Sequence, residues 1–161
     1  MQNEQTFAPT ATPDENLLAQ LKNGAGWLYW IAILSFVNSL LFLFGSNLGF
    51  PIGLGYTLFI DGIGFVAVNE GAPSFVKGIG LVVNLGIVLI CAGFAHFASR
   101  AHSWAFIVAI VLYAFDALLH LVLGSVASFG FHAFALIWIV RGYLACRKLL
   151  QFTPAASPAE A

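Results

Sequence analysis

Asp116 and His120 lie four residues apart in a long apolar stretch, a spacing that places two side chains on one face of a helix. A carboxylate there can orient an imidazole and select its tautomer, as happens beside metal ions and in proton relays. Tyr113 lies about one turn earlier. His132 follows a tight turn at 124–127, at about the same distance from the turn as His120. We therefore expect the two histidines to face each other across a helical hairpin.

A metal ion could find three ligands in Asp116, His120 and His132, and a fourth in Asp61 from an upstream segment. The same residues could instead form a proton relay. The spacing is generic, and no two-histidine metalloprotease helix is present. We therefore predict no cofactor, with a metal ion or haem as the alternative. The sequence also lacks a nucleophile turn, a phosphate-binding loop and a dinucleotide fingerprint. These absences argue against an enzyme.

Polar side chains inside a membrane are costly unless an interhelical bond or a function offsets the cost. Asn38, Asn84 and Asp116 each fall roughly 10 Å below the outer ends of their expected helices, at 1.5 Å of rise per residue. We interpret this shared layer first as a hydrogen-bonded cluster that fixes helix packing. A site for a cation, a proton or a small ligand is the alternative interpretation.

Long apolar runs must position these residues. They lie near 27–45, 76–98, 104–123 and 128–146, and each is long enough to cross a bilayer. Hydrophobic residues make up 60% of the 161-residue chain and charged residues only 8%, against about 25% charged in soluble domains. The composition predicts an all-α integral membrane protein. A net charge of −1 with scattered cations excludes nucleic acid as a partner.

The segment 49–68 is apolar but contains Pro51, several glycines and Asp61. If this segment does not cross the membrane, four cationic residues lie on one side of the bilayer and Lys77 alone lies on the other. The four on the cytoplasmic side would be Lys22, Arg100, Arg147 and Lys148. We therefore predict a four-helix transmembrane bundle with an additional re-entrant or interfacial helical segment, and both termini cytoplasmic. Five transmembrane helices are the alternative.

The chain divides into three parts in this interpretation: a polar N-terminal tail with a short amphipathic helix (1–25), one transmembrane domain (26–150) and a disordered C-terminal tail (151–161). Thr12, Pro13 and Glu15 form a plausible helix start, and Gly24 a plausible helix end.

Residues expected at the cytoplasmic membrane interface are aromatic or can extend a charge to the headgroups: Trp27, Trp30, Trp104 and Arg141. Gly78, Gly86 and Gly93 recur at about two-turn spacing and predict a close contact between their helix and another.

Two stretches, HSWAFIVAIVLYAFDALLHLVLG at 102–124 and SFGFHAFALIWIVRGY at 128–143, resemble small uncharacterised polytopic membrane proteins of bacteria. The residues that carry the resemblance are Trp104, Tyr113 and Asp116 in the first stretch, and Gly130, Phe131, His132, Arg141 and Gly142 in the second. The resemblance implies a bacterial cytoplasmic membrane and transfers no functional residues.

The sequence thus favours a non-catalytic structural or interaction component of the cytoplasmic membrane, in contact with lipid and with copies of itself or a larger complex. The competing hypothesis is an ion-, proton- or metal-handling membrane protein that uses Asp116, His120 and His132.

Overall fold

The computed structural model describes residues 14–46 and 53–152, and these residues form five helices without a β-strand. The helices are α1 (Glu15–Leu43), α2 (Gly55–Asn69), α3 (Phe75–Ser99), α4 (Ser103–Val122) and α5 (Val126–Phe152). Four of them are long and apolar enough to cross a membrane, whereas α2 has only 15 residues. At 1.5 Å per residue α2 falls short of the roughly 30 Å hydrocarbon core. The predicted helical membrane bundle with one additional short helical segment is confirmed.

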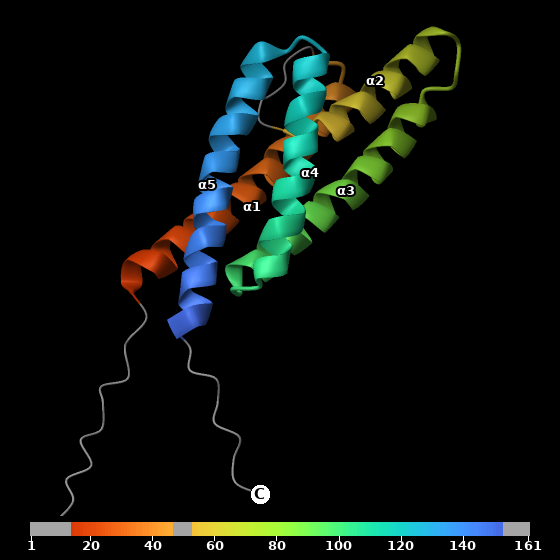
Figure 1. The fold of residues 1–161 in the computed structure, drawn as a ribbon. Coiled ribbons are helices and arrows are strands. Elements are labelled where there is room, and N and C mark those ends of the chain that lie inside the picture. The colour runs from red at the N-terminus through yellow and green to blue at the C-terminus, as the bar shows by residue number, and fades with distance from the viewer. Residues whose placement is uncertain (1–13, 47–52, 153–161) are drawn as a thin grey trace, which may run out of the picture.

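The four long helices run alternately up and down, so the start of α1 and the end of α5 lie at the same end of the bundle (Figure 1). The bundle is built on the antiparallel pairs α1–α3, α1–α5 and α4–α5. Short turns join α3 to α4 and α4 to α5, and Gly124 adopts a positive φ of 75° in the second. A residue with a side chain is disfavoured at such a φ, and glycine permits the tight hairpin.

The short helix α2 begins inside the bundle instead of at its edge. The backbone N–H of Leu54, which precedes α2, donates to Ser35 Oγ of α1 at 2.7 Å. Ser35 lies about two turns before the end of α1, so the chain has returned into the bundle before α2 starts. From there α2 rises beside α3 toward the end opposite the termini (Figure 1). This is the geometry of a re-entrant segment.

The expected helix end at Gly24 was wrong, because α1 continues through it. A Cβ atom at Gly24 would lie 2.6 Å from the Cα of Gly142, so the two glycines allow the α1 and α5 backbones to touch. The helix starts at Glu15 and is capped by Asp14, whose Oδ1 accepts from the backbone N–H of Asn16 at 2.9 Å. Thr12 and Pro13 of the predicted start lie outside the described residues.

The close helix contact expected at three glycines of α3 is not observed. A Cβ atom at Gly78, Gly86 or Gly93 would meet no heavy atom within 4 Å. These glycines therefore do not mediate close helix packing among the described residues, contrary to the expectation from their spacing.

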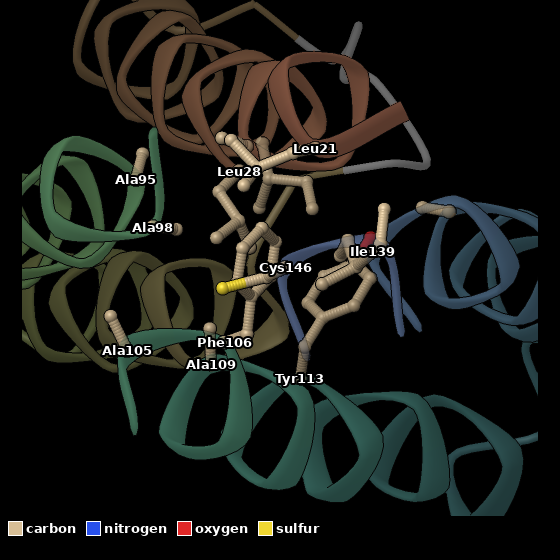
Figure 2. Close-up of a cluster of buried hydrophobic side chains, with 14 of the residues drawn as sticks. Leu21, Leu28, Ala95, Ala98, Ala105, Phe106, Ala109, Tyr113, Ile139 and Cys146 are labelled. Atoms are coloured by element: carbon tan, nitrogen blue, oxygen red, sulfur yellow. The ribbon is translucent and has the colours of Figure 1, made fainter. Parts of the chain in front are cut away.

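The apolar core fills the space between α1, α4 and α5 (Figure 2). Phe106 and Tyr113 of α4 point into this space, where they meet Leu28 of α1 and Ile139 of α5. Small buried residues, including Ala95 and Ala98 of α3 and Ala105 of α4, complete the core. Small side chains let helices approach closely where lipid and protein are equally apolar. Most other large apolar side chains face outward, as lipid contact requires.

Gly24→Ala is expected to destabilise the bundle by about 1–3 kcal/mol, the usual cost of overpacking, because its methyl group would overlap the α5 backbone. Gly26→Ala is the matched control, since a Cβ there meets nothing within 4 Å and alanine has the higher helix propensity. Thermal unfolding in detergent should show a lower midpoint for the first variant only. Equal midpoints would contradict the direct backbone contact.

Candidate functional site

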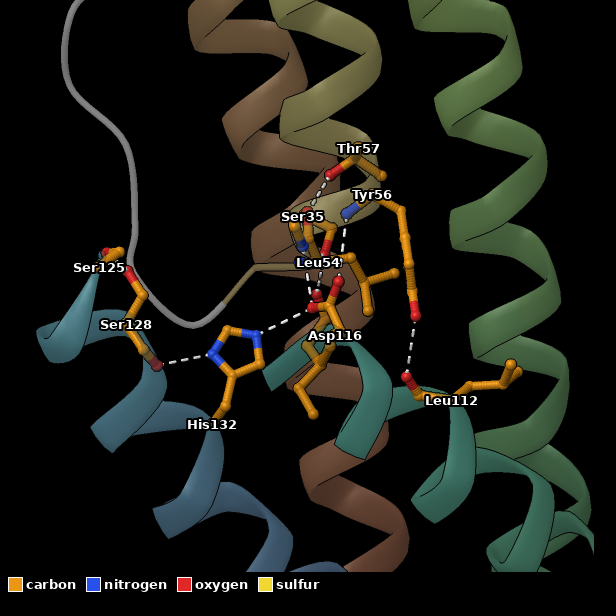
Figure 3. Close-up of polar contacts among 11 residues, drawn as sticks. Ser35, Leu54, Tyr56, Thr57, Leu112, Asp116, Ser125, Ser128 and His132 are labelled. Carbon is orange, nitrogen blue, oxygen red and sulfur yellow. Dashed lines mark hydrogen bonds and ion pairs between the residues drawn. The ribbon is translucent and has the colours of Figure 1, made fainter. Parts of the chain in front are cut away.

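The start of α2 is held by the carboxylate of Asp116 from α4 (Figure 3). The backbone N–H of Gly55 donates to Oδ2 at 2.9 Å, and that of Tyr56 donates to Oδ1 at 3.2 Å. The first N–H groups of a helix have no partner within it, and they carry partial positive charge. Asp116 therefore caps α2 from another helix, in a place where no water is needed to satisfy these donors.

His132 of α5 contacts the same carboxylate, with Nε2 2.9 Å from Asp116 Oδ2. Its Nδ1 lies 2.7 Å from the backbone carbonyl oxygen of Ser128, and its ring stacks on Tyr113 at a centroid distance of 4.6 Å. A neutral imidazole has only one N–H, whereas both nitrogens here face acceptors. The Asp116–His132 pair must therefore hold an additional proton or share a metal ion.

His120 completes the group from the last turn of α4. Its ring centroid lies 4.6 Å from that of His132, as expected for a hairpin that places the two histidines opposite each other. Candidate ligand atoms of Asp116, His120 and His132 all lie within 4.8 Å of one another, and all three residues are buried. His120 Nε2 is itself buried and has no hydrogen-bond partner among the residues that the structure describes. Within residues 14–46 and 53–152, this nitrogen is thus free to bind a ligand.

Gly55 keeps the space beside His120 open. A Cβ atom at this position would lie 2.9 Å from His120 Nε2 and 3.0 Å from Asp116 Oδ1. A groove along α2 starts at Gly55 and His120 and extends past Gly62 to Glu70, at the C-terminal end of the helix. The site can therefore be reached along the surface of α2.

Asp61 does not join this group. It lies about two turns along α2, where its Oδ2 accepts from Ser39 Oγ at 2.8 Å and its Oδ1 accepts from Asn84 Nδ2 at 2.8 Å. Asn84 Nδ2 also faces Ser39 Oγ at 2.9 Å and the backbone carbonyl oxygen of Thr57 at 3.1 Å. Asp116 and Asp61 thus belong to two separate polar groups, one at the start of α2 and one about two turns further along it.

The three residues of the expected polar layer are all buried, but they are distributed around α2. Asp116 belongs to the first group and Asn84 to the second, while Asn38 lies against Gly53, where a Cβ would be 2.5 Å from Asn38 Nδ2. Whether these residues share a functional site stays a prediction.

Sequence reasoning missed Ser35, Ser39 and Gly55. The two serines are four residues apart on α1, and this spacing was a signal that both face the same neighbour. The importance of Gly55 depends on what lies beside it, and no local pattern reveals that.

The expected interface residues lie on α1, α4 and α5. Trp30 and Trp104 are 60% and 47% exposed, Trp27 packs edge-on against Phe134, and Arg141 lies over the ring of Trp138 at 4.9 Å. Their position at the headgroup level remains a prediction.

No model of a protein family matches the chain, and no curated protein or solved structure matches it. Function must therefore be inferred from the residues of the site and their geometry.

Replacing Asp116 with alanine is expected to release the start of α2, because it leaves one buried and one partly buried N–H group without acceptors, at about 1–3 kcal/mol each. Hydrogen exchange followed by mass spectrometry should accelerate over residues 53–60. His120→Ala is the control, because His120 Nε2 bonds to no described residue. Unchanged exchange in the Asp116 variant would show that other contacts fix α2.

Proposed function

We propose that this multi-pass membrane protein binds a divalent transition-metal ion through Asp116, His120 and His132. The observation that carries the proposal is the buried His120 Nε2, which bonds to none of the described residues and lies close to a carboxylate and a second imidazole. An unsatisfied buried polar atom costs free energy, and a bound ion would remove that cost. The ion would also replace the proton that Asp116 and His132 otherwise share.

The donor set is chemically suited to zinc, iron(II) or cobalt(II). Two imidazoles and one carboxylate are common ligands of these ions, whereas calcium and magnesium prefer oxygen ligands alone. Metal-bound histidines usually donate their second N–H to a carbonyl or carboxylate, and His132 Nδ1 faces the Ser128 carbonyl in this way. The backbone N–H groups of Gly55 and Tyr56 would orient the carboxylate.

Three protein ligands leave a coordination position for water or a small ligand. The groove that starts at Gly55 and His120 reaches this side of the site. We therefore interpret the groove as the route by which the ion or a small ligand arrives.

A structural role is the second candidate, because Asp116 already has partners for both oxygens within the protein. In that case the group would only fix α2 in the bundle, and the protein would act as a non-catalytic component that associates with itself or a larger complex. This role does not explain why His120 Nε2 is buried without a hydrogen-bond partner in the described part of the chain.

We propose that the protein lies in a bacterial cytoplasmic membrane with both termini on the cytoplasmic side. Four cationic residues lie toward the end of the bundle where α1 starts and α5 ends: Lys22, Arg100, Arg147 and Lys148. Lys77 lies toward the other end. The positive-inside rule supports this orientation.

Titration of the metal-free protein with cobalt(II) is expected to produce a visible absorption band at one ion per chain. His120→Gln and Asp116→Asn should each weaken binding by more than about 100-fold, because losing outer-shell partners alone costs 10- to 100-fold. Binding should also weaken as the pH falls, since protons compete for the imidazole nitrogens.

A control variant and a variant that fills the space beside the ligands test the site further. His102→Gln removes a histidine at the opposite end of α4 and should leave cobalt binding unchanged. Gly55→Ala retains every ligand but fills the space beside His120 Nε2, so it should weaken binding. If cobalt produces no band, or the same band in His120→Gln, the metal proposal is wrong and the structural role is favoured.

Labelling of intact cells with a membrane-impermeant thiol reagent tests the orientation. Ser74→Cys in the exposed turn before α3 should react from outside, whereas the control Ser99→Cys at the other end of α3 should not. The native cysteines are half-buried (Cys91) and buried (Cys146), and the labelling of the unmodified protein gives the background signal. The reverse pattern would invert the proposed orientation.

A further inference from the structure

An apolar pocket lies at the start of α2, separate from the groove that leads to His120. Leu54 and Tyr56 line this pocket, whereas Gly55 between them lines the groove. The other walls come from α1, α3 and α4, and the pocket has a volume of about 200 Å³. An apolar cavity of roughly 150 Å³ is large enough to bind benzene. The pocket can therefore hold part of an apolar molecule.

The pocket runs from the outward-facing surface of the bundle into its core. Its inner wall includes Leu28 and Ile31 of α1, which are 1% and 0% exposed. Among the residues of its outer wall, Ile90 of α3 and Leu112 of α4 are 61% and 45% exposed. The pocket therefore opens between α3 and α4, two of the helices that are long and apolar enough to cross a membrane.

The opening lies at the middle depth of the membrane. Leu112 is close to the midpoint of α4, roughly 15 Å from either end of the helix at about 1.5 Å per residue. The hydrocarbon core of a bilayer is roughly 30 Å thick. The bundle is therefore surrounded at this depth by the inner ends of lipid acyl chains, and headgroups and water lie further out.

The walls of the pocket are almost entirely apolar, and polar side chains among them face partners in the protein. The Tyr56 hydroxyl donates to the backbone carbonyl oxygen of Leu112 at 3.3 Å (Figure 3). The Cys91 thiol faces the backbone carbonyl oxygen of Leu28 at 3.8 Å. Such walls favour an apolar occupant over a headgroup or a water-soluble molecule. A hydrocarbon chain would supply the dispersion contacts that the walls of an empty space lose.

We infer that this pocket binds the end of a lipid acyl chain, which enters between α3 and α4. The depth of the opening determines the occupant, because acyl chains are the apolar molecules that surround the bundle there. Lipid that only surrounds the bundle contacts exposed side chains. A chain in the pocket also reaches Leu28 and Ile31, which are buried.

The bound chain packs against two residues that also hold the polar group at Asp116. Tyr113 lines the pocket and its ring stacks on His132. Tyr56 lines the pocket too, and its backbone N–H donates to Asp116 Oδ1. The chain thus fills the space beside the start of α2. These contacts are present without a metal ion, so the inference does not rest on the proposed metal site.

The test uses the full chain in vesicles of phosphatidylethanolamine and phosphatidylglycerol, with a trace of phosphatidylglycerol that carries a diazirine at the end of one acyl chain. After irradiation, mass spectrometry should locate adducts on Leu28 and Ile31 as well as on the exposed Ile90. A diazirine beside the headgroup should leave Leu28 and Ile31 unlabelled. Ile139 is buried outside the pocket and should stay unlabelled with either lipid. Adducts confined to exposed side chains, or equal labelling of Ile139, would overturn the inference.

Variants that fill the pocket provide a second test. Ala109→Phe places a ring in the pocket from α4 and should remove the adducts on the buried wall. Val108→Phe is the matched control, because Val108 does not line the pocket, and it should retain them. Ile87→Phe narrows the pocket from α3 and gives the same measurement if the first variant does not fold. His120→Gln should retain the adducts whether or not it binds cobalt. Buried-wall adducts that persist in a folded pocket-filling variant would contradict the inference.

Discussion

The capping of α2 by Asp116 is the interaction on which the polar interior depends. A helix that starts inside an apolar bundle presents backbone N–H groups that need acceptors there, and each group left unsatisfied costs about 1–3 kcal/mol. The carboxylate provides an acceptor for two of these groups and a charge opposite to the helix terminus. His132, fixed by the Ser128 carbonyl and the Tyr113 ring, holds that carboxylate in place.

The helix α2 connects the two polar groups through rigid backbone. Its first residues contact Asp116, and its second turn carries Asp61 to Ser39 and Asn84. A shift of α2 along its own axis would change both sets of contacts together.

The sequence predicted some contacts because local geometry alone determines them. A turn of a few residues forces antiparallel packing of α4 and α5. The pairing of His120 with His132 therefore follows from their equal separation in residues from that turn. Pairings between distant segments could not be obtained in this way. The assignment of Asp61 to Asn84, and of Gly24 to Gly142, depends on how α1 packs against α3 and α5.

Hydrophobicity and length along the chain determined that this is a helical membrane protein with four long helices, because each helix satisfies its own backbone and must match the thickness of the bilayer. Only the tertiary structure decided where α2 begins and which polar atoms stay without partners. Those features depend on the distances between helices. Apolar periodicity does not encode these distances, since lipid and neighbouring helices are equally apolar surroundings for a side chain.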